Sequence, residues 1–241
     1  MILKTEKLSS QKKLMKPKRI ILIRHGESEG NINKKVYREK PDYTLLLTET
    51  GISQAQHLGE KLLYLFEKEH SYFYVSPFWR TRMTFENIVK CFPREQFSYN
   101  EEPRIREQEW GHLRTVSEIE IIEKERKNYG SFYYRIPDGE SAADLYDRVS
   151  DFFDTLFRDF EYQDFPENAL IITHGMSIRV FLMRWFHWTV EEFESYKNPG
   201  NCDMYILEKQ ENGKYELITP LKLKVGYSGH SRPIKLEHDK H

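Results

Sequence analysis

The sequence feature that most constrains the fold is an aliphatic run that ends abruptly at a basic pair. Residues Ile20–Ile23 are all branched aliphatic, which is typical of a strand buried on both faces of a parallel sheet. The run stops at Arg24-His25-Gly26, and small polar residues follow. In open α/β sheets, ligands bind at the carboxyl ends of the strands. The strand is therefore expected to carry His25 to the edge where a ligand would bind.

The residues around His25 favour an anionic ligand. Arg24 places a fixed positive charge beside the imidazole, which attracts an anion and disfavours protonation of the ring. A neutral His25 can then act as a nucleophile. Gly26 allows the backbone to approach a ligand closely, and Ser28 and Asn31 add neutral hydrogen-bond donors.

A later segment repeats this arrangement. Residues 169–172 form another aliphatic run that leads through Thr173 to His174-Gly175, and a helix is expected over 176–186. A single histidine at a strand end is commonly structural. Two strands that both end in His-Gly are a different case, because parallel strands bring their carboxyl ends to one edge. We therefore expect His25 and His174 to face one site, with the amides near Gly175 beside them.

The segment after the first turn alternates between loop, helix and strand patterns. Residues 31–48 show no clear period and are expected to form a loop over the site. Apolar residues spaced by three and four predict a helix over 52–66, and Tyr72–Val75 predicts a second strand. A further helix is expected to begin at Ser76-Pro77, since proline is tolerated in a first helical turn. Arg80 would then lie in that first turn.

The middle of the chain continues the pattern. Residues 97–105 are expected to be extended, and Ser117–Glu120 resembles a capping box that opens a charged helix up to Asn128. We interpret the lysines and glutamates of that helix as a solvated face. An aromatic stripe over 145–160 predicts a long helix packed on the core.

The chain ends with hairpin signals, which complete a fold class. Residues 202–209 and 215–218 are joined across Asn212-Gly213, as in a β-hairpin on a sheet edge. The whole pattern predicts an α/β protein, a three-layer αβα sandwich with a mostly parallel sheet and a C-terminal edge hairpin. We expect one domain over 19–220, a flexible N-terminal arm over 1–18 and a C-terminal tail over 221–241.

Composition excludes several function classes. The formal net charge of −1 argues against a nucleic-acid-binding protein, so any attraction for phosphate must be local. Residues 1–18 lack the apolar centre of a signal peptide, and no segment has the length of a membrane span, so a cytoplasmic protein without membrane contact is expected. Cys91 and Cys202 are expected to be reduced thiols. His238 and His241 are too sparse for a metal site, and we expect no metal and no other cofactor.

Arg24-His25-Gly26-Glu27-Ser28, with Asn31 six residues after the histidine, resembles the R-H-G-E-S/T-x-x-N signature of the histidine phosphatase superfamily, also called phosphoglycerate-mutase-like. The resemblance covers roughly Arg19 to Leu207. It implies a phosphohistidine intermediate on His25. It also implies that Arg80, after strand-Ser-Pro, is the second phosphate-binding arginine, beside Arg24, Asn31 and Gly175.

The same resemblance implies a proton donor at a glutamate four residues before a glycine. Glu107 fits that spacing, and Glu109 is the competing candidate. Gly139-Glu140-Ser141 resembles a motif of the phosphatase branch. Glu140 would either hold an arginine or act only as a charge at a helix start.

These implications predict a phosphomonoester hydrolase acting on a small phosphorylated metabolite. His25 would attack phosphorus, Glu107 would protonate the leaving oxygen, and Arg24, Arg80 and His174 would neutralise charge. The likeness is nearest to the broad-range acid phosphatases of fungi and plants. A cofactor-dependent mutase is an alternative, although 112–136 lacks the adjacent arginine pair expected there. A fructose-2,6-bisphosphatase-like enzyme and a non-catalytic phospho-ligand binding module are further alternatives.

The substrate and the oligomeric state stay open at this level. Several aromatic residues could line a pocket for an aromatic or sugar leaving group, or could equally belong to the core or anchor loops: Tyr37, Tyr43, Trp79, Trp110, Tyr133 and Tyr134.

Overall fold

The structure, a computed structural model, describes residues 16–112 and 115–225, and its centre is a six-stranded sheet of order β3-β2-β4-β1-β5-β6. The strands are β1 (Arg19–Arg24), β2 (Ser71–Val75), β3 (Phe97–Glu101), β4 (Asn168–Thr173), β5 (Met204–Lys209) and β6 (Tyr215–Leu217). β3, β2, β4 and β1 run parallel, whereas β5 is antiparallel to β1 and β6 to β5. The predicted mostly parallel sheet with a C-terminal edge hairpin is confirmed.

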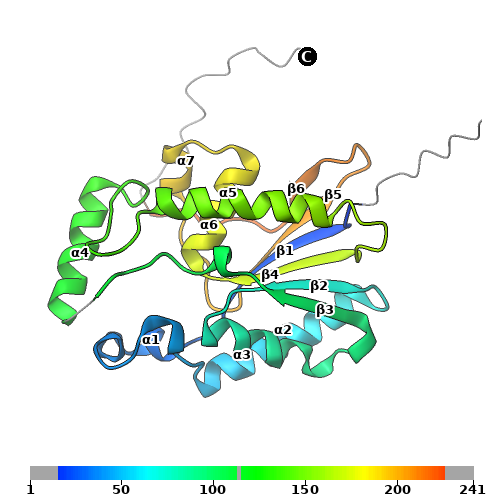
Figure 1. The fold of residues 1–241 in the computed structure, drawn as a ribbon, viewed down its shortest axis with the longest axis horizontal. Helices are drawn as coiled ribbons and strands as arrows, with labels where there is room; N and C mark the ends of the chain where they lie inside the picture. The colour runs from blue at the N-terminus through cyan, green and yellow to red at the C-terminus, as the bar shows by residue number, and fades with distance from the viewer. Residues whose placement is uncertain (1–15, 113–114, 226–241) are drawn as a thin grey trace, which may run out of the picture.

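Helices cover both faces of the sheet, as Figure 1 shows. The α-helices are α1 (Glu29–Ile32), α2 (Glu49–Phe66), α3 (Trp79–Ile88), α4 (Val116–Tyr129), α5 (Ala142–Asp159), α6 (Gly175–Phe186) and α7 (Val190–Ser195). α2 and α3 lie below the sheet in this view and α5 and α6 above it, while α1 and α4 lie beyond the carboxyl ends of the parallel strands. The predicted three-layer αβα architecture is therefore present.

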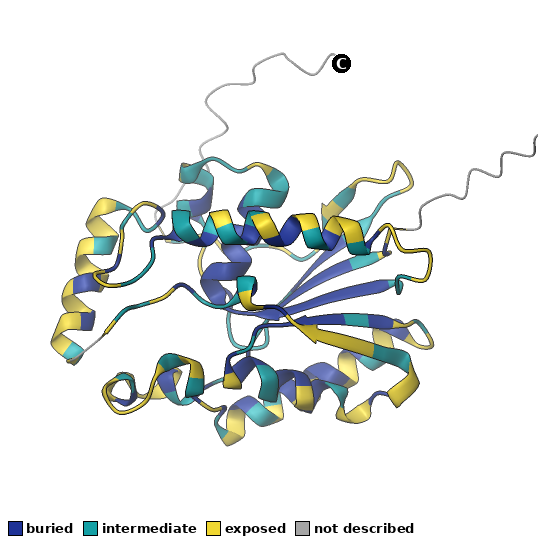
Figure 2. Ribbon diagram, viewed as in Figure 1, coloured by how far each residue is buried: buried dark blue, intermediate teal, exposed yellow. Residues whose placement is uncertain are grey.

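The inner strands β1 and β4 are buried because both of their faces meet a hydrophobic layer, whereas most of β3 at the sheet edge is exposed. Ile20 and Leu22 of β1 pack into the cluster that contains α5 and α6, whereas Ile21 and Ile23 pack into the cluster that contains α2 and α3. All four are fully buried, which explains a continuous aliphatic run in place of alternation. Figure 2 shows the buried strands at the centre and the exposed outer faces of the surrounding helices.

Two glycines bring the loop after β1 against the start of α2. A Cβ on Gly26 would lie 2.5 Å from the carbonyl oxygen of Gly51, and one on Gly51 would lie 2.0 Å from that of Glu27. Any larger residue would force these two backbones apart. The close packing holds the loop that carries His25 against the rigid core.

The predicted loop over 31–48 is more ordered than expected. It contains the end of α1 and two 3₁₀ turns, η1 (Lys34–Arg38) and η2 (Asp42–Thr44). Local caps support these short elements: the Asn31 side chain accepts from the Ser28 amide, and the Asn33 side chain accepts from the Lys35 amide. Such turns lack the apolar period from which longer helices are predicted.

Three predicted boundaries were wrong. Helix α3 begins at Trp79 with Phe78 as N-cap, so Pro77 precedes the helix. The capping box of α4 is Thr115 with Glu118, two residues before the predicted Ser117, because the threonine hydroxyl accepts from the Glu118 amide. Residues 97–105 are extended only to Glu101, since η5 (Pro103–Ile105) turns the chain. The remaining 3₁₀ turns are η3 (Val89–Cys91) and η4 (Arg94–Gln96).

The chain ends include segments that hydrogen-bond to the domain. Lys224, placed by the sequence in the tail, donates its amide to the Ser195 carbonyl, and Lys222 pairs with Asp203. Residues 1–15 of the predicted arm and 226–241 of the predicted tail, including His238 and His241, lie outside the described residues. Over 16–112 and 115–225, no helix is long and apolar enough to cross a membrane.

Candidate active site

The two strand-end histidines meet at the carboxyl edge of the sheet. β1 and β4 are paired neighbours, with Arg24 opposite Thr173, so His25 and His174 follow directly at the same level. Their ring centroids lie 5.2 Å apart, at an interplanar angle of 61°. Parallel pairing thus joins two residues that are far apart in the sequence.

His25 is buried and is held by its own loop. Its Nδ1 lies 2.7 Å from the carbonyl oxygen of Gly26. A carbonyl can only accept, so Nδ1 carries the proton and Nε2 keeps its lone pair. Burial, and then the charges of Arg80 and Arg24, hold the pKa of His25 well below its usual range. The ring is therefore neutral, with one unprotonated nitrogen.

His174 is fully buried and is held differently. It is the N-cap residue of α6, and its Nε2 lies 2.8 Å from the hydroxyl oxygen of Ser76, at the end of β2. Its Nδ1 is buried without a hydrogen-bond partner among the described residues. Burial, followed by the positive charge of Arg80, lowers its pKa well below the usual value. Sequence reasoning did not assign a role to Ser76.

Two arginines border the histidines. Arg24 donates to the Pro199 carbonyl at 2.6 Å, but its Nε is buried without a partner among the described residues. Arg80, in the first turn of α3, is buried and makes a two-pronged ion pair with Asp42 at 2.9 and 3.2 Å. Asp42 comes from η2, so this pair ties the segment over the site to the sheet.

The Glu107 carboxylate lies at the N-terminus of α6. Its oxygens accept from the amide of Met176 at 3.2 Å and from the amide of Gln108 at 3.0 Å. The competing Glu109 is exposed and accepts from the Gly111 amide, outside the cavity that His25 lines. The structure therefore brings Glu107, and not Glu109, to the histidine pair.

An arginine that the sequence analysis did not single out holds the segment that carries Glu107. Arg148 of α5 donates to three backbone carbonyls, those of residues 104, 106 and 107, at 2.7 to 2.9 Å. The Glu140 carboxylate accepts hydrogen bonds from Nη2 and Nε of the same guanidinium, at 2.8 and 3.1 Å, and also forms an ion pair with Arg106. Glu140 therefore positions arginines, which is one of the two roles that the sequence left open for it. The only sequence signal for Arg148 is that it lies in a predicted helix, eight residues after Glu140.

Asn31 and Gly175 complete the predicted set. The Asn31 side-chain oxygen accepts from the Ser28 amide and from Asn201, so its NH₂ group is what can be offered to a ligand. Gly175 is the first residue of α6, where backbone amides have no helical partner. A Cβ there would meet Asn198 at 3.4 Å, an ordinary contact, so sterics alone do not require glycine.

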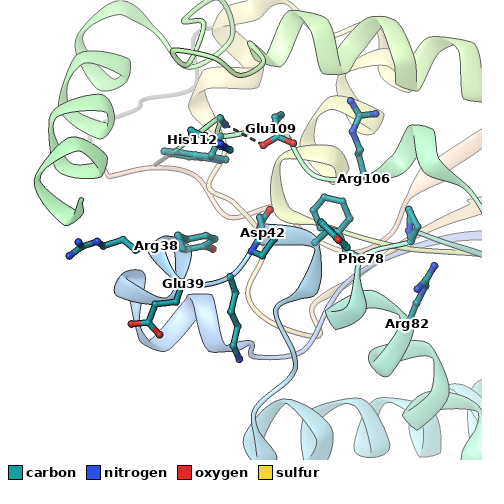
Figure 3. A pocket seen from close by; sticks show the side chains of 15 residues that line it. Arg38, Glu39, Asp42, Phe78, Arg82, Arg106, Glu109 and His112 are labelled. Atoms are coloured by element: carbon teal, nitrogen blue, oxygen red, sulfur yellow. Dashed lines mark hydrogen bonds between the residues drawn. The ribbon is translucent and has the colours of Figure 1, made fainter. Parts of the chain in front are cut away.

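Two cavities adjoin at this edge. The catalytic cavity, of about 280 Å³, is lined by His25, Arg24, Arg80, Glu107 and Asn31, among others. Lys34 and Glu123 also line it and pair at 2.7 Å, which joins η1 to α4 across the site. The outer cavity, of about 920 Å³, is shown in Figure 3 and shares Tyr37, Asp42 and Trp110 with the first.

The aromatic candidates divide between cavity and surface. Tyr37, Tyr43 and Trp110 line the outer cavity, and burial raises the pKa of Tyr37 to about 12. Trp79 lines neither cavity and lies against the Arg82 guanidinium. Tyr133 and Tyr134 contact other aromatic rings near α4.

The side chains at this edge also bear on metal binding. Within residues 16–112 and 115–225, no group of three or more histidine, cysteine, aspartate or glutamate side chains could hold a metal ion. The cavity that His25 lines contains three cations, Arg24, Arg80 and Lys34, and the carboxylates Asp42, Glu107 and Glu123. Asp42 and Glu123 are already paired with two of these cations, whereas Arg24 keeps a buried Nε without a partner among the described residues. This donor set fits an anion better than a cation.

The sheet and its two strand-end histidines define an α/β protein with a buried histidine pair at the carboxyl edge of the sheet. Comparison with known sequences agrees, because the profile of the Histidine phosphatase superfamily (branch 1) matches residues 20–218. The chain belongs to this superfamily.

The relatives of this chain carry the names of both mutase-like proteins and phosphatases. Phosphoglycerate mutase-like protein AT74 of Arabidopsis thaliana is 43% identical over 223 residues, covering 87% of this chain and 70% of the relative. The broad-range acid phosphatase DET1 of Saccharomyces cerevisiae is 31% identical, covering 86% and 90%. The mycobacterial glucosyl-3-phosphoglycerate phosphatase Rv2419c, solved with VO3, shares the fold with a TM-score of 0.67 at 18% identity, covering 85% and 99%. The superfamily thus contains phosphatases and mutase-like proteins.

Proposed function

We propose that the protein hydrolyses phosphomonoesters through a phosphohistidine intermediate on His25. The observation that carries this proposal is the bond from Nδ1–H of His25 to the Gly26 carbonyl, which leaves Nε2 as an unprotonated nucleophile. The ring lines a cavity that also contains Arg24, Arg80 and the Glu107 carboxyl group, and phosphoryl transfer requires groups of these kinds.

The proposed reaction has two steps. In the first, Nε2 of His25 bonds to phosphorus, the ester P–O bond breaks, and the leaving oxygen takes a proton from Glu107. In the second, water attacks the phosphohistidine, Glu107 accepts a proton from this water, and the N–P bond breaks to release phosphate. The same carboxyl acts first as acid and then as base.

Charge neutralisation supplies most of the expected rate acceleration. Arg24 can offer its unpartnered Nε to a phosphate oxygen, Arg80, which is paired with Asp42, adds positive charge beside it, and the α6 amides add donors. Two buried atoms without partners, Nε of Arg24 and Nδ1 of His174, support an anion at this point, since an unsatisfied buried polar group costs about 1–3 kcal/mol. A bound phosphate dianion also favours the imidazolium form of His174.

A hydrolase fits the charges better than a mutase. A mutase must hold a second acidic group on its substrate, and this requires spare cations near the site. Lys34, a cation of the catalytic cavity besides the two arginines, is paired with Glu123. The name of the yeast relative, a broad-range acid phosphatase, agrees with a hydrolase that acts on small phosphorylated metabolites.

The test is to trap the intermediate. Protein mixed with ³²P-labelled phenyl phosphate and quenched in alkali within milliseconds should carry acid-labile label that maps to His25, with and without a chelator. Label on another residue would contradict the nucleophile. Loss of activity with chelator would indicate a metal-dependent reaction instead, and a protein that binds phosphate but releases none from any ester would be a binding module.

A further inference from the structure

The outer cavity is far larger than a small sugar phosphate needs. The catalytic cavity of about 280 Å³ can already take a phosphoryl group with a compact leaving group. The adjoining cavity of about 920 Å³ lies at the upper end of the range for sites of drug-sized ligands, roughly 300–1,000 Å³. Because the two share Tyr37, Asp42 and Trp110, a leaving group that departs from His25 can extend directly into the outer cavity.

The charges of the outer cavity do not call for a second anion. Its basic side chains are already matched by carboxylates outside the lining, namely Arg82 by Glu101 at 2.7 Å, Arg106 by Glu140 at 2.6 Å and Lys40 by Glu29 at 2.8 Å. Arg38 is exposed and extends away from the cavity in Figure 3. The lining itself adds the acidic groups Glu39 and Glu109. A second phosphate or carboxylate would therefore gain little here.

Aromatic surface is what the cavity offers instead. The Phe78 ring lies 5.1 Å from the His174 ring and under the Arg80 guanidinium, and it is only 7% exposed, so it belongs to the buried floor of the outer cavity. Figure 3 shows Phe78 at the middle of the lining. The accessible aromatic wall consists of Trp110, which lines both cavities and also lies against the Arg126 guanidinium, and Tyr43, which is 54% exposed. An accessible aromatic face can bind a planar ring by stacking.

We propose that the outer cavity is a leaving-group subsite that selects phosphomonoesters of nucleoside size, with a planar aromatic group beyond the phosphorylated sugar. The inference rests on the proposed phosphatase function. In the reaction the P–O5′ bond of a nucleoside 5′-monophosphate breaks, and the nucleoside leaves with the proton from Glu107. The base stacks on Trp110, which lines both cavities, or on Tyr43 further out in the lining.

A matched pair of substrates tests this subsite on the wild-type protein. Adenosine 5′-monophosphate and ribose 5-phosphate have the same phosphate and the same sugar carbon, and differ by the base. We expect kcat/KM to be about tenfold or more higher for the nucleotide, since stacking one base on an aromatic side chain has this order of effect. Equal or higher efficiency with ribose 5-phosphate overturns the subsite and leaves the phosphatase proposal intact. Release from neither substrate, nor from phenyl phosphate, removes both.

Two tryptophans provide the matched variants. Trp110→Ala should reduce the ratio of the two kcat/KM values about tenfold, because it removes part of the aromatic wall. Trp79→Ala is the control, since Trp79 is 44% exposed on α3 and lines neither cavity, and it should leave the ratio unchanged. A ratio that falls equally in both variants, or in neither, contradicts the proposal.

Discussion

The turns after β1 and β4 have nearly the same sequence pattern, yet the protein holds their histidines in opposite ways. At the first turn, Nδ1 of His25 bonds to the carbonyl of the next residue. At the second turn, Nε2 of His174 bonds to Ser76, the residue after β2, and Nδ1 has no partner among the described residues. In the proposed mechanism, the hydrogen-bond partner of each ring, rather than the His-Gly pair, distinguishes the nucleophile from the phosphate-binding group.

The helices after the two turns differ as well. The chain after His25 makes only the four-residue α1, whereas His174 caps α6, a buried helix of twelve residues. The second turn therefore supplies fixed amides, one of which binds Glu107. We infer that the first turn supplies the reacting nitrogen, and that the second supplies His174 and an amide that positions the proton donor Glu107.

The largest expected effect is at the first turn. His25→Ala should lower kcat by at least about 10⁴-fold, because no other group replaces the attacking nitrogen. Stopped-time assays with phenyl phosphate measure the rate, and alkaline quenching shows whether label is bound. A His25→Ala variant that still forms acid-labile phosphoenzyme would contradict the assignment of the nucleophile to the first turn.

The proton donor held by the second turn should come next. Glu107→Gln should lower kcat about 10²–10³-fold for an alkyl phosphate, which needs protonation of its leaving oxygen. The loss should be much smaller for para-nitrophenyl phosphate, whose leaving group needs little help. Glu109→Gln is the comparison: Glu109 is exposed and lines only the outer cavity, which these small esters do not fill, so neither rate should change by more than about twofold. Equal losses in the two variants would disprove the assignment of Glu107.

His174→Ala should lower kcat/KM about 10²-fold, the usual cost of removing one group that stabilises transition-state charge. Unlike His25→Ala, it should still form labelled phosphohistidine, only more slowly. Rapid-quench labelling of the two variants side by side makes the distinction. Complete absence of phosphoenzyme in His174→Ala would mean that the two rings are not divided in role.

Ser76→Ala tests what holds the second ring. Loss of one hydrogen bond to His174 should lower kcat about 2–10-fold, the equivalent of roughly 0.5–1.5 kcal/mol. The acid limb of the kcat profile should also move, because the serine no longer fixes one ring nitrogen. Ser76→Thr keeps a hydroxyl and should restore part of both effects. An unchanged pH profile would indicate that Ser76 has a structural role only.

The smallest effect is expected in the pH dependence of the free energy of unfolding. The pKa values of both rings are lowered in the folded protein, so below about pH 6.5 the unfolded chain binds protons that the folded chain does not. Each ring should therefore reduce the free energy of unfolding by about 1 kcal/mol between pH 6.5 and 5.5. Urea titrations of the wild type and of a His25→Asn/His174→Asn variant measure this difference. An equal loss in both proteins would show that the rings are not neutral when folded.

Residues that depend on one strand and its next turn could be predicted from the sequence. The aliphatic runs indicated buried parallel strands, and parallel pairing then placed His25 and His174 at one edge. Arg80 could be placed in a first helical turn, although the helix starts after Pro77 rather than at it. Resemblance to the superfamily, and not periodicity, selected Glu107 over Glu109.

Other features depended on contacts between distant segments. Arg148 binds three backbone carbonyls that lie more than forty residues earlier in the chain. Ser76, which follows β2, bonds to His174, which follows β4. Asp42 lies in a turn whose sequence has no apolar period, and it pairs with Arg80. Nothing in their local sequence marks these residues, because a polar side chain finds its partner only after the core has packed. The outer cavity likewise forms where three separate segments meet.

The sequence by itself therefore determined the sheet, the single edge that carries both histidines, and the family, because strand burial and strand-to-helix turns are encoded locally by hydrophobic pattern and glycine. Only the tertiary structure decided which ring nitrogen is free, which side chains hold the two rings, and where the two cavities lie. These depend on hydrogen bonds and ion pairs between groups that adjoin only in the folded chain.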